Sequence, residues 1–158
     1  MVMVKQILRR TFVILSFIAI TAQVHAQNGK YIADHKLLAT ILGEHYGIPS
    51  SVILAIATVE SSGGAGPAAK VLHNHFGIVG KNSYVNHRGH SSRYKQYDNV
   101  YASYIDFCDL IARRKFYSRL KNTEDPQKWI KAISGSGYSE SPEEWEQKVT
   151  SVLRDNKL

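Results

Sequence analysis

The chain has 158 residues, which is enough for one domain, and a single cysteine, Cys108, which excludes an intrachain disulfide. Its formal net charge is +7, from 20 basic and 13 acidic residues, but the basic residues are scattered rather than clustered. This pattern and the lack of a known recognition motif argue against a nucleic-acid partner, while the positive charge still favours some anionic polymer or surface.

The first 26 residues have the layout of a secretory signal peptide. Lys5, Arg9 and Arg10 precede an apolar stretch of about ten residues, and small residues around Ala26 resemble a cleavage site. Because spanning a bilayer takes roughly 20 apolar residues, we expect no stable membrane insertion after leader removal; an uncleaved anchor is the alternative. We therefore expect export to the periplasm or cell surface and a mature domain over 27–158, with 17 basic and 13 acidic residues and a net charge of +4.

Helical periodicity dominates the mature part. Apolar residues at helical spacing predict a helix over 33–46, a second one that begins at Ser50 or Ser51, and a third from Val100. Cys108 falls on the apolar stripe of the third helix, so we expect it in the core rather than as a reactive thiol.

Two capping patterns predict the starts of further helices near the carboxyl end. Asp125 followed by Pro126 is typical of a helix N-terminus. Ser141 and Glu144 have the spacing of a capping box, in which each side chain satisfies a backbone donor of the other.

Residues 61–98 differ from the helical parts. A glycine-rich loop is followed by loosely alternating residues with a turn around Asn86–Gly89, which predicts a β-hairpin or small sheet. The expected fold is α+β and mostly α, with a small β insertion and no domain boundary.

Glu60 ends the second predicted helix on an unusual face. At helical spacing it lies in line with Ile53 and Ile56, so the carboxyl stands at the rim of an apolar surface. Desolvation there would raise its pKa, and a carboxyl that stays protonated near neutrality can give a proton to a leaving group. The alternative is structural, with Glu60 bonded to a neighbouring backbone group or paired with a lysine.

Four stretches in order resemble the glucosaminidase family of peptidoglycan hydrolases, which includes flagellar-rod muramidase-like enzymes and endo-β-N-acetylglucosaminidase autolysins. They are "SSVILAIATVESSGG", "HNHFGIVGK", "RYKQYDNVYASYIDFCDLI" and "SGYSESPEEW". The resemblance covers roughly residues 35–152. It implies a lysozyme-like fold, with a helical lobe, a small β-hairpin lobe and a cleft between them, and cleavage of β-1,4 bonds in cell-wall glycan strands.

The resemblance also implies roles for individual residues. Glu60 would be the general acid, and Tyr138 would face it across the site. Residues implied to line the cleft or bind substrate are Asn74, His75, Phe76, Gly77 and Tyr97.

One feature departs from the family pattern, because no aspartate or glutamate occurs from Ser61 to Tyr97. Asp98 is the first candidate for a second acid, although an N-cap role is the plainer explanation. Three mechanisms stay open: the 2-acetamido group of the substrate as internal nucleophile, a loop that brings Asp98 or Glu140 to the cleft, or a single acid assisted by Tyr138.

Neither a metal nor a cofactor is expected. One residue separates His73 from His75, and two separate His87 from His90, but no carboxylate or cysteine accompanies them in a familiar zinc spacing. Polar contacts to a sugar or to the protein are the plainer explanation for these histidines.

Several aromatic residues are candidates for stacking on sugar rings. They are Tyr84, Tyr94, Tyr97 and Trp129, and core packing is the alternative for each.

The expected partner is the peptidoglycan glycan strand, bound by a monomer. A non-catalytic glycan-binding module on the same fold is one rival interpretation. A lytic transglycosylase is another, since it also needs only one acid; its usual "G-L-M-Q" segment is absent, and "HFGIV" stands in its place.

Overall fold

The computed structural model describes the backbone of residues 2–84 and 91–158, and the side chains of this part from Gln23 onward. The predicted turn at Asn86–Gly89 and the histidines His87 and His90 lie outside the described residues. The helices in the described part are α1 (Val2–Tyr46), α2 (Ser50–Ser61), α3 (Pro67–Leu72), α4 (Val100–Ala112), α5 (Tyr117–Leu120), α6 (Pro126–Ser134) and α7 (Pro142–Asp155).

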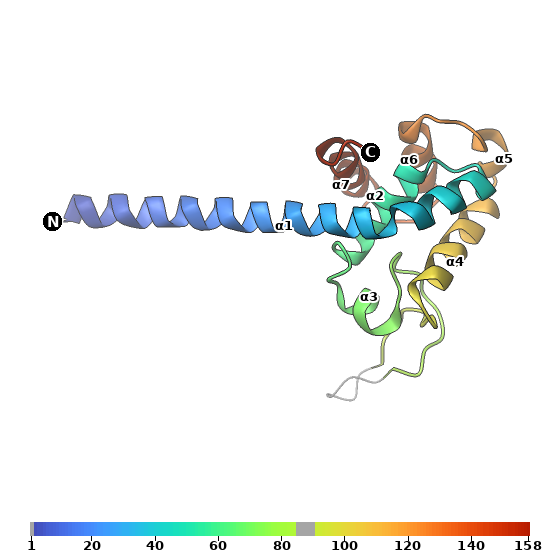
Figure 1. Cartoon of the computed structure of the whole chain (residues 1–158), viewed down its shortest axis with the longest axis horizontal. Helices are drawn as coiled ribbons and strands as arrows, with labels where there is room; N and C mark the ends of the chain where they lie inside the picture. Colours follow the sequence, from blue (N-terminus) through green and yellow to red (C-terminus); the bar gives the residue numbers. More distant parts are fainter. Residues whose placement is uncertain (1, 85–90) are drawn as a thin grey trace.

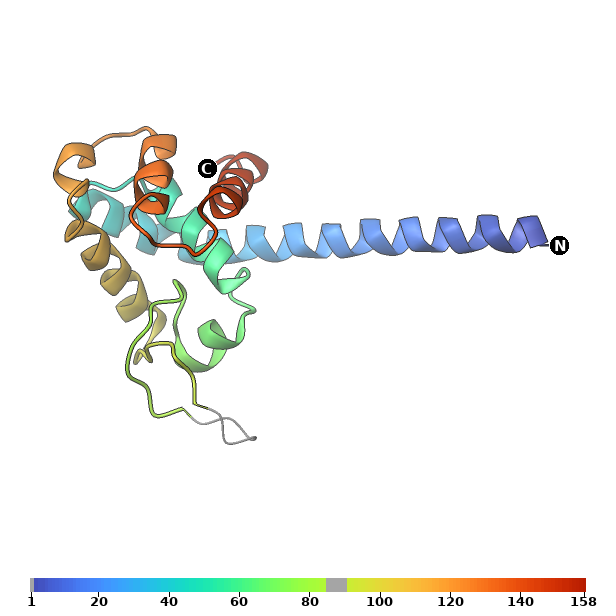
Figure 2. The same cartoon turned by 180° about the vertical axis from the view of Figure 1, so that it is seen from behind.

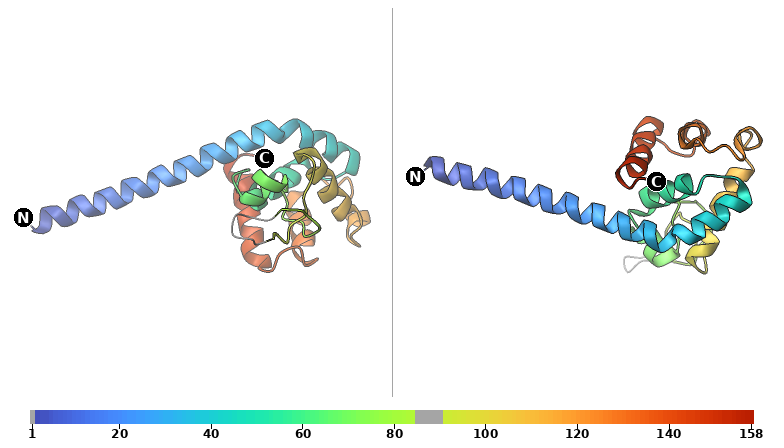
Figure 3. Two further views of the ribbon diagram at one scale, coloured as in Figure 1. Left: turned by 90° about the horizontal axis from the view of Figure 1, so that it is seen from below. Right: turned by 45° about the horizontal axis from the view of Figure 1, so that its top comes forward.

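The helix predicted over 33–46 is the last part of a much longer helix, α1. Its amino-terminal half projects away from the rest of the molecule in every view (Figures 1, 2 and 3). Among its described side chains, Tyr31 and Ile32 are the first that are buried. In the described part of the chain, no helix combines the length and hydropathy needed to cross a bilayer. The signal peptide over 1–26 stays a prediction.

Helix α2 is the centre of the fold and begins where the sequence predicts. It contacts α1, α3, α6 and α7, with α6 and α7 on one side and α3 on the other (Figure 1). The six residues from Val52 to Ala57 are each at most 2% exposed. Since full burial of one large aliphatic side chain contributes about 1.5–3 kcal/mol, this helix fixes the positions of the elements around it.

Helix α4 begins as predicted, but its cap is one residue later than Asp98. The Asn99 side chain accepts a hydrogen bond from the Ala102 backbone N–H at 2.9 Å and is the N-cap. The prediction for Cys108 is confirmed: the side chain is fully buried, and burial raises the pKa of its thiol to about 12.

The two predicted carboxyl-terminal helices are both present. Asp125 caps α6 by accepting from the Gln127 backbone N–H at 3.0 Å, as expected. Helix α7 starts after Ser141, but the prediction of a capping box at its start is wrong. The Ser141 side chain makes no capping bond, and Glu144 pairs with the Lys148 Nζ at 2.6 Å instead.

Between α3 and α4 the two chain segments run antiparallel without forming a strand in the described residues. One bridge joins Val79 and Tyr94, and the Lys95 backbone N–H donates to the Ile78 carbonyl at 2.8 Å. The predicted β-hairpin lobe is therefore not confirmed, whereas the mostly helical prediction is.

Side-chain amides explain why the pairing stays irregular. The Asn74 Nδ2 donates to the carbonyls of Ile78 and Lys95, each at 2.8 Å. The Asn82 Nδ2 donates to the carbonyls of Ser92 and Tyr94, each at 2.7 Å. The Ile78 carbonyl still accepts from the Lys95 N–H. However, the Ile78 N–H donates to the Asn74 Oδ1 at 3.2 Å, and the Lys95 carbonyl accepts from the Asn74 Nδ2, so these two backbone groups do not bond to each other as in a regular ladder.

Candidate active site

Two cavities share a wall at Glu60. The larger, which we call the charged arm, has a volume of about 510 Å³ and is lined by Glu60, Phe76, Gly77, Ile78, Val79, Arg93, Tyr94, Leu110, Arg114, Gly137, Tyr138, Ser139 and Glu140. The smaller, which we call the apolar arm, has about 320 Å³ and is lined by Glu60, Ser62, Gly66, Pro67, Ala68, Ala69, Val71, Leu72, Gly77, Tyr84, Ser92 and Tyr94. Glu60, Gly77 and Tyr94 belong to both.

Glu60 is accessible because the chain turns away directly after it. The residue lies in the last turn of α2, and the helix is ended by Ser62 in the left-handed region at φ 52°. The Gly63 backbone N–H then donates to the Thr58 carbonyl at 2.8 Å, which closes the helix end. The carboxyl is left at the junction of the two arms.

The surroundings of Glu60 favour its protonated form. Burial raises the pKa of its carboxyl, and the negative end of the helix dipole acts in the same direction. The Trp145 indole N–H donates to Oε1 at 2.6 Å and, with the positive charge of Lys148, partly offsets this increase in pKa. The indole also fixes the position of the carboxyl.

Gly77 allows the loop after α3 to approach the acid. Its φ of +65° is in the left-handed region, and a Cβ at this position would lie 3.2 Å from the Glu60 Oε2. Both facts exclude an ordinary side chain without a shift of the loop or of the carboxyl.

Tyr138 lies in the charged arm with Glu60, as the resemblance implies. Its hydroxyl donates to the Phe76 carbonyl at 2.8 Å, and its ring packs against Trp145 at 5.4 Å between centroids. Burial and the negative charge of Glu60 raise the pKa of Tyr138 well above its usual value. The phenol is therefore neutral, and the hydrogen bond to Phe76 leaves its oxygen lone pairs as acceptors.

Asn74 and His75 line neither arm. Asn74 is 1% exposed, and both ends of its amide are bonded to backbone groups of the loop. The His75 Nδ1 lies 2.7 Å from the Tyr31 hydroxyl, and burial lowers the pKa of the imidazole to about 4. The structure thus gives both residues a supporting role behind the cleft wall rather than a place on it.

Of the other predicted binding residues, Phe76 and Gly77 line the charged arm but Tyr97 does not. The Phe76 ring is buried and stacks on Phe107 at 4.1 Å. Tyr97 is also buried, and its hydroxyl donates to the Asp106 Oδ2 at 2.7 Å.

The four aromatic candidates for sugar stacking divide in two. Tyr84 and Tyr94 line the arms, whereas Tyr97 and Trp129 are buried. Asp98, the candidate second acid, is exposed and lines neither arm. Glu140 lines the charged arm, with its side chain 91% exposed and its Oε1 3.6 Å from the Arg93 Nη2.

Sequence reasoning missed Trp145, Arg93 and Arg114. Trp145 is 85 positions away from Glu60, and no local pattern shows that its indole reaches the acid. Arg114 lines the charged arm with Leu110, but it lies beyond the end of α4, so helical spacing does not indicate its position.

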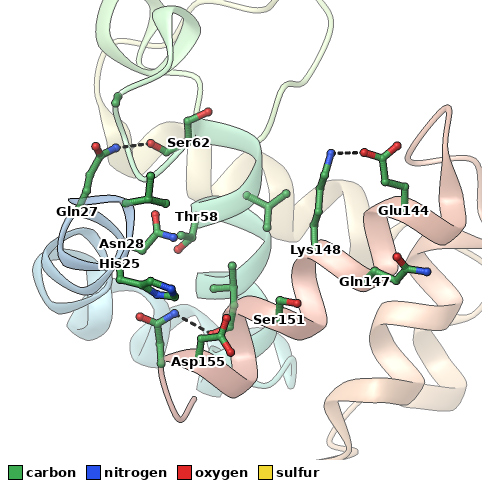
Figure 4. A pocket seen from close by; sticks show the side chains of 15 residues that line it. His25, Gln27, Asn28, Thr58, Ser62, Glu144, Gln147, Lys148, Ser151 and Asp155 are labelled. Carbon is green, nitrogen blue, oxygen red and sulfur yellow. Dashed lines mark hydrogen bonds and ion pairs between the residues drawn. The ribbon is translucent and has the colours of Figure 1, made fainter. Parts of the chain in front are cut away.

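A larger cavity of about 780 Å³ lies between α1, α2 and α7 (Figure 4). On its wall the Gln27 Nε2 donates to the Ser62 carbonyl at 2.6 Å. Val24 and His25, from the predicted leader, form part of this wall, so we place the site at Glu60 instead. Within the described part of the chain, no three His, Cys, Asp or Glu side chains are grouped to hold a metal ion.

Comparison with known families identifies the family of this chain. The profile of the glucosaminidase family, described as mannosyl-glycoprotein endo-β-N-acetylglucosaminidase, matches residues 36–158. The chain belongs to the glucosaminidase family. The match confirms the family resemblance seen in the four sequence stretches and makes the protein a member of a glycoside hydrolase family.

Three solved structures share the fold of this chain. The hydrolase domain of Salmonella typhimurium FlgJ superposes with a TM-score of 0.66 at 21% identity, over 82% of this chain and 88% of that one. A peptidoglycan hydrolase from Sphingomonas sp. A1 gives 0.65 at 18% identity, over 82% and 89%. The catalytic domain of the autolysin Auto from Listeria monocytogenes gives 0.66 at 16% identity, over 83% and 85%. Among curated proteins, none matches the chain.

Proposed function

We propose that this member of the glucosaminidase family hydrolyses the β-1,4 glycosidic bonds of bacterial cell-wall glycan, as an endo-β-N-acetylglucosaminidase with Glu60 as general acid. The observation that carries this proposal is a carboxyl with a raised pKa at the junction of two cavities. A glycan that fills both arms would place a glycosidic oxygen beside Glu60. Structural neighbours named as a peptidoglycan hydrolase and an autolysin support this substrate. Action on the cell wall requires export, in agreement with the predicted leader.

Proton transfer from Glu60 is the first chemical step. The protonated carboxyl gives its proton to the leaving oxygen as the glycosidic bond breaks, and the carboxyl becomes a carboxylate. The Trp145 indole N–H, 2.6 Å from Oε1, then stabilises the new negative charge.

The opposite face of the sugar needs a nucleophile or a base. Since Asp98 lines neither arm, the remaining protein candidate is Glu140, which is exposed and close to Arg93. We favour the substrate's 2-acetamido group as internal nucleophile. The Tyr138 oxygen would accept a hydrogen bond from the acetamido N–H and would stabilise the positive charge that develops on the sugar. Glu140→Gln should then keep most of the activity, and a thiazoline analogue of the cyclised acetamido intermediate should inhibit.

A lytic transglycosylase is the second candidate, because Glu60 is the only acidic residue that lines both arms in the described part of the chain. Such an enzyme needs no base to activate water. It would end its products in an anhydro sugar instead of a reducing end.

Mass spectrometry of products from purified peptidoglycan tests the proposal and both rivals. We expect fragments with reducing N-acetylglucosamine ends. Reducing N-acetylmuramic acid ends would show that the other β-1,4 linkage of the strand is cut. Anhydro ends would show that the enzyme is a lytic transglycosylase. Sedimentation of the protein with the polymer, without any release of fragments, would establish a non-catalytic binding module.

A further inference from the structure

The two arms of the cleft differ in charge. Besides Glu60, which they share, the apolar arm has no charged residue among its described lining, and small or apolar side chains of α3 form much of its wall. The charged arm has Arg93, Arg114 and Glu140. A cleft of this kind distinguishes the two ends of a ligand whose successive units differ in charge.

Arg114 lies in the charged arm just beyond the end of α4. Its backbone N–H donates to the Ile111 carbonyl at 3.0 Å, and Arg114 and Leu110 both line the arm. The side chain is partly buried, and no carboxylate lies within 4.0 Å of its guanidinium in the part of the chain that the structure describes. A partly desolvated guanidinium without a counter-charge favours an anionic ligand, and its fork of N–H donors matches a carboxylate.

Arg93 enters the same arm from the segment before α4. Its guanidinium carbon lies 5.5 Å from the centre of the Tyr94 ring, and its Nη2 lies 3.6 Å from the Glu140 Oε1. Because the two side chains are 65% and 91% exposed, this ion pair contributes little and can be exchanged for a ligand carboxylate.

We propose that Arg93 and Arg114 bind a carboxylate of the glycan in the charged arm, while the apolar arm takes the neighbouring uncharged N-acetylated sugar. The carboxylate comes from the lactyl ether of the sugar or from the peptide attached to it. This inference rests on the proposed function and extends it, because neutral and carboxylate-bearing sugars alternate in the cell-wall strand. Binding in one register then directs every cut to the same type of linkage.

Neutralised substrate tests this proposal. Glycan strands are prepared with native carboxylates and with the same carboxylates converted to neutral methylamides, and kcat/KM is measured on both. We expect wild type to prefer the native strand by about tenfold or more, as charge-assisted hydrogen bonds allow. The double variant R93Q/R114Q should cleave the native strand as slowly as the neutral one. Arg119→Gln is the matched control, since it removes the same charge from a residue that lines neither arm, and it should keep the preference.

The source of the carboxylate is found by repeating the comparison on strands from which an amidase has removed the peptides, because the lactyl carboxyl forms the amide bond to the peptide and is free only on these strands. A preference for free over methylamidated carboxylates on the stripped strands assigns the lactyl carboxylate, and a preference confined to peptide-bearing strands assigns the peptide. Equal rates of wild type on native and neutral strands would overturn the inference while leaving the proposed hydrolysis intact. Absence of cleavage of every strand would instead refute the proposed function.

Discussion

The neighbours of Glu60 have opposite effects on the pKa of its carboxyl. Burial and the helix terminus disfavour its charge, while the Trp145 indole and Lys148 favour it. A group held in this balance can stay protonated in the free enzyme and still be stabilised as an anion after it has given up its proton. The positions of Ile53 and Ile56 in the sequence predicted that an apolar surface would raise the pKa of Glu60. The indole contact could not be predicted, because it depends on how α7 packs against α2.

Trp145→Phe should raise the pKa of Glu60, because the lost hydrogen bond stabilises only the charged form. The loss of activity at high pH should then move upward by about one pH unit in a profile of kcat/KM, since a hydrogen bond to a charged group is worth about 1.5–3 kcal/mol. Trp129→Phe is the control: that indole is also buried but donates to the Thr123 carbonyl. If the pH profile of kcat/KM for Trp145→Phe were unchanged, or moved to lower pH, it would contradict the role of Glu60 as the general acid that this indole stabilises as an anion.

His75 should make the protein sensitive to acid. Its pKa is about 4 when folded and about 6.5 when unfolded, so the unfolded chain binds a proton first as the pH falls. The stability that the neutral imidazole contributes is present above pH 6.5 and is lost as the pH falls toward 4. Urea unfolding at pH 7.5 and 4.5 should show that wild type loses about 2 kcal/mol more than His75→Gln over this interval. Equal losses in the two proteins would show that His75 is not held neutral.

At the level of elements, the loop after α3 positions the cleft wall. The sequence motif around Asn74 correctly indicated a loop near the acid, but it did not show which side chains face the cavity. Asn74 and His75 face inward because their polar groups bond to Ile78, Lys95 and Tyr31. Motif position alone cannot separate a residue that lines a cleft from one that holds the lining in place.

Gly77→Ala should reduce activity more than stability. A left-handed φ costs a non-glycine residue about 1–2 kcal/mol, and the added methyl would also press on the Glu60 Oε2 from 3.2 Å. Gly64→Ala is the control, because its φ is +77° and its added Cβ would press on the Tyr31 ring from 2.9 Å, but Gly64 lines neither arm. Thermal unfolding should show similar losses in both variants, and glycan turnover should fall about tenfold or more only in Gly77→Ala. Equal turnover in the two variants would refute a close approach of this loop to the acid.

The predicted β-hairpin is where reasoning about elements was least successful. Alternation between Phe76 and Tyr97 correctly indicated two antiparallel segments, and one bridge is present. The Asn74 side chain bonds to the Lys95 carbonyl and to the Ile78 N–H, which a regular pair of strands would bond to each other. Helices α2, α4, α6 and α7 were predictable because their periodicity and boundaries are local, whereas these bonds across the loop are not.

Across the whole molecule, the folded domain is concentrated in the part after the predicted leader. Residues 23–27 are exposed. Among the side chains of α1 that the structure describes, the first buried one is Tyr31, whose hydroxyl bonds to His75 and Tyr104. The family match also begins later, at residue 36.

A chain that begins at Gln27 should therefore fold with the same thermal midpoint as the full chain, within about 2 °C, and turn over glycan at the same rate. Differential scanning calorimetry and a turnover assay of both forms measure this. A chain that begins at Lys36 lacks Tyr31 and is the contrasting control, with a clearly lower midpoint expected from the lost buried aromatic. Unfolding of the Gln27 form would show that the first 26 residues are part of the domain.

The whole account depends on a proton held by Glu60, and Glu60→Gln tests it most directly. The amide keeps the shape of the side chain but cannot donate the proton to a leaving oxygen. We expect glycan hydrolysis to fall about 100-fold or more, while sedimentation with the polymer is unchanged and the thermal midpoint at neutral pH is equal or higher. A variant that is folded, binds the polymer and retains more than about 5% of the wild-type rate would contradict the account, since general acid catalysis by that residue contributes at least ~100-fold.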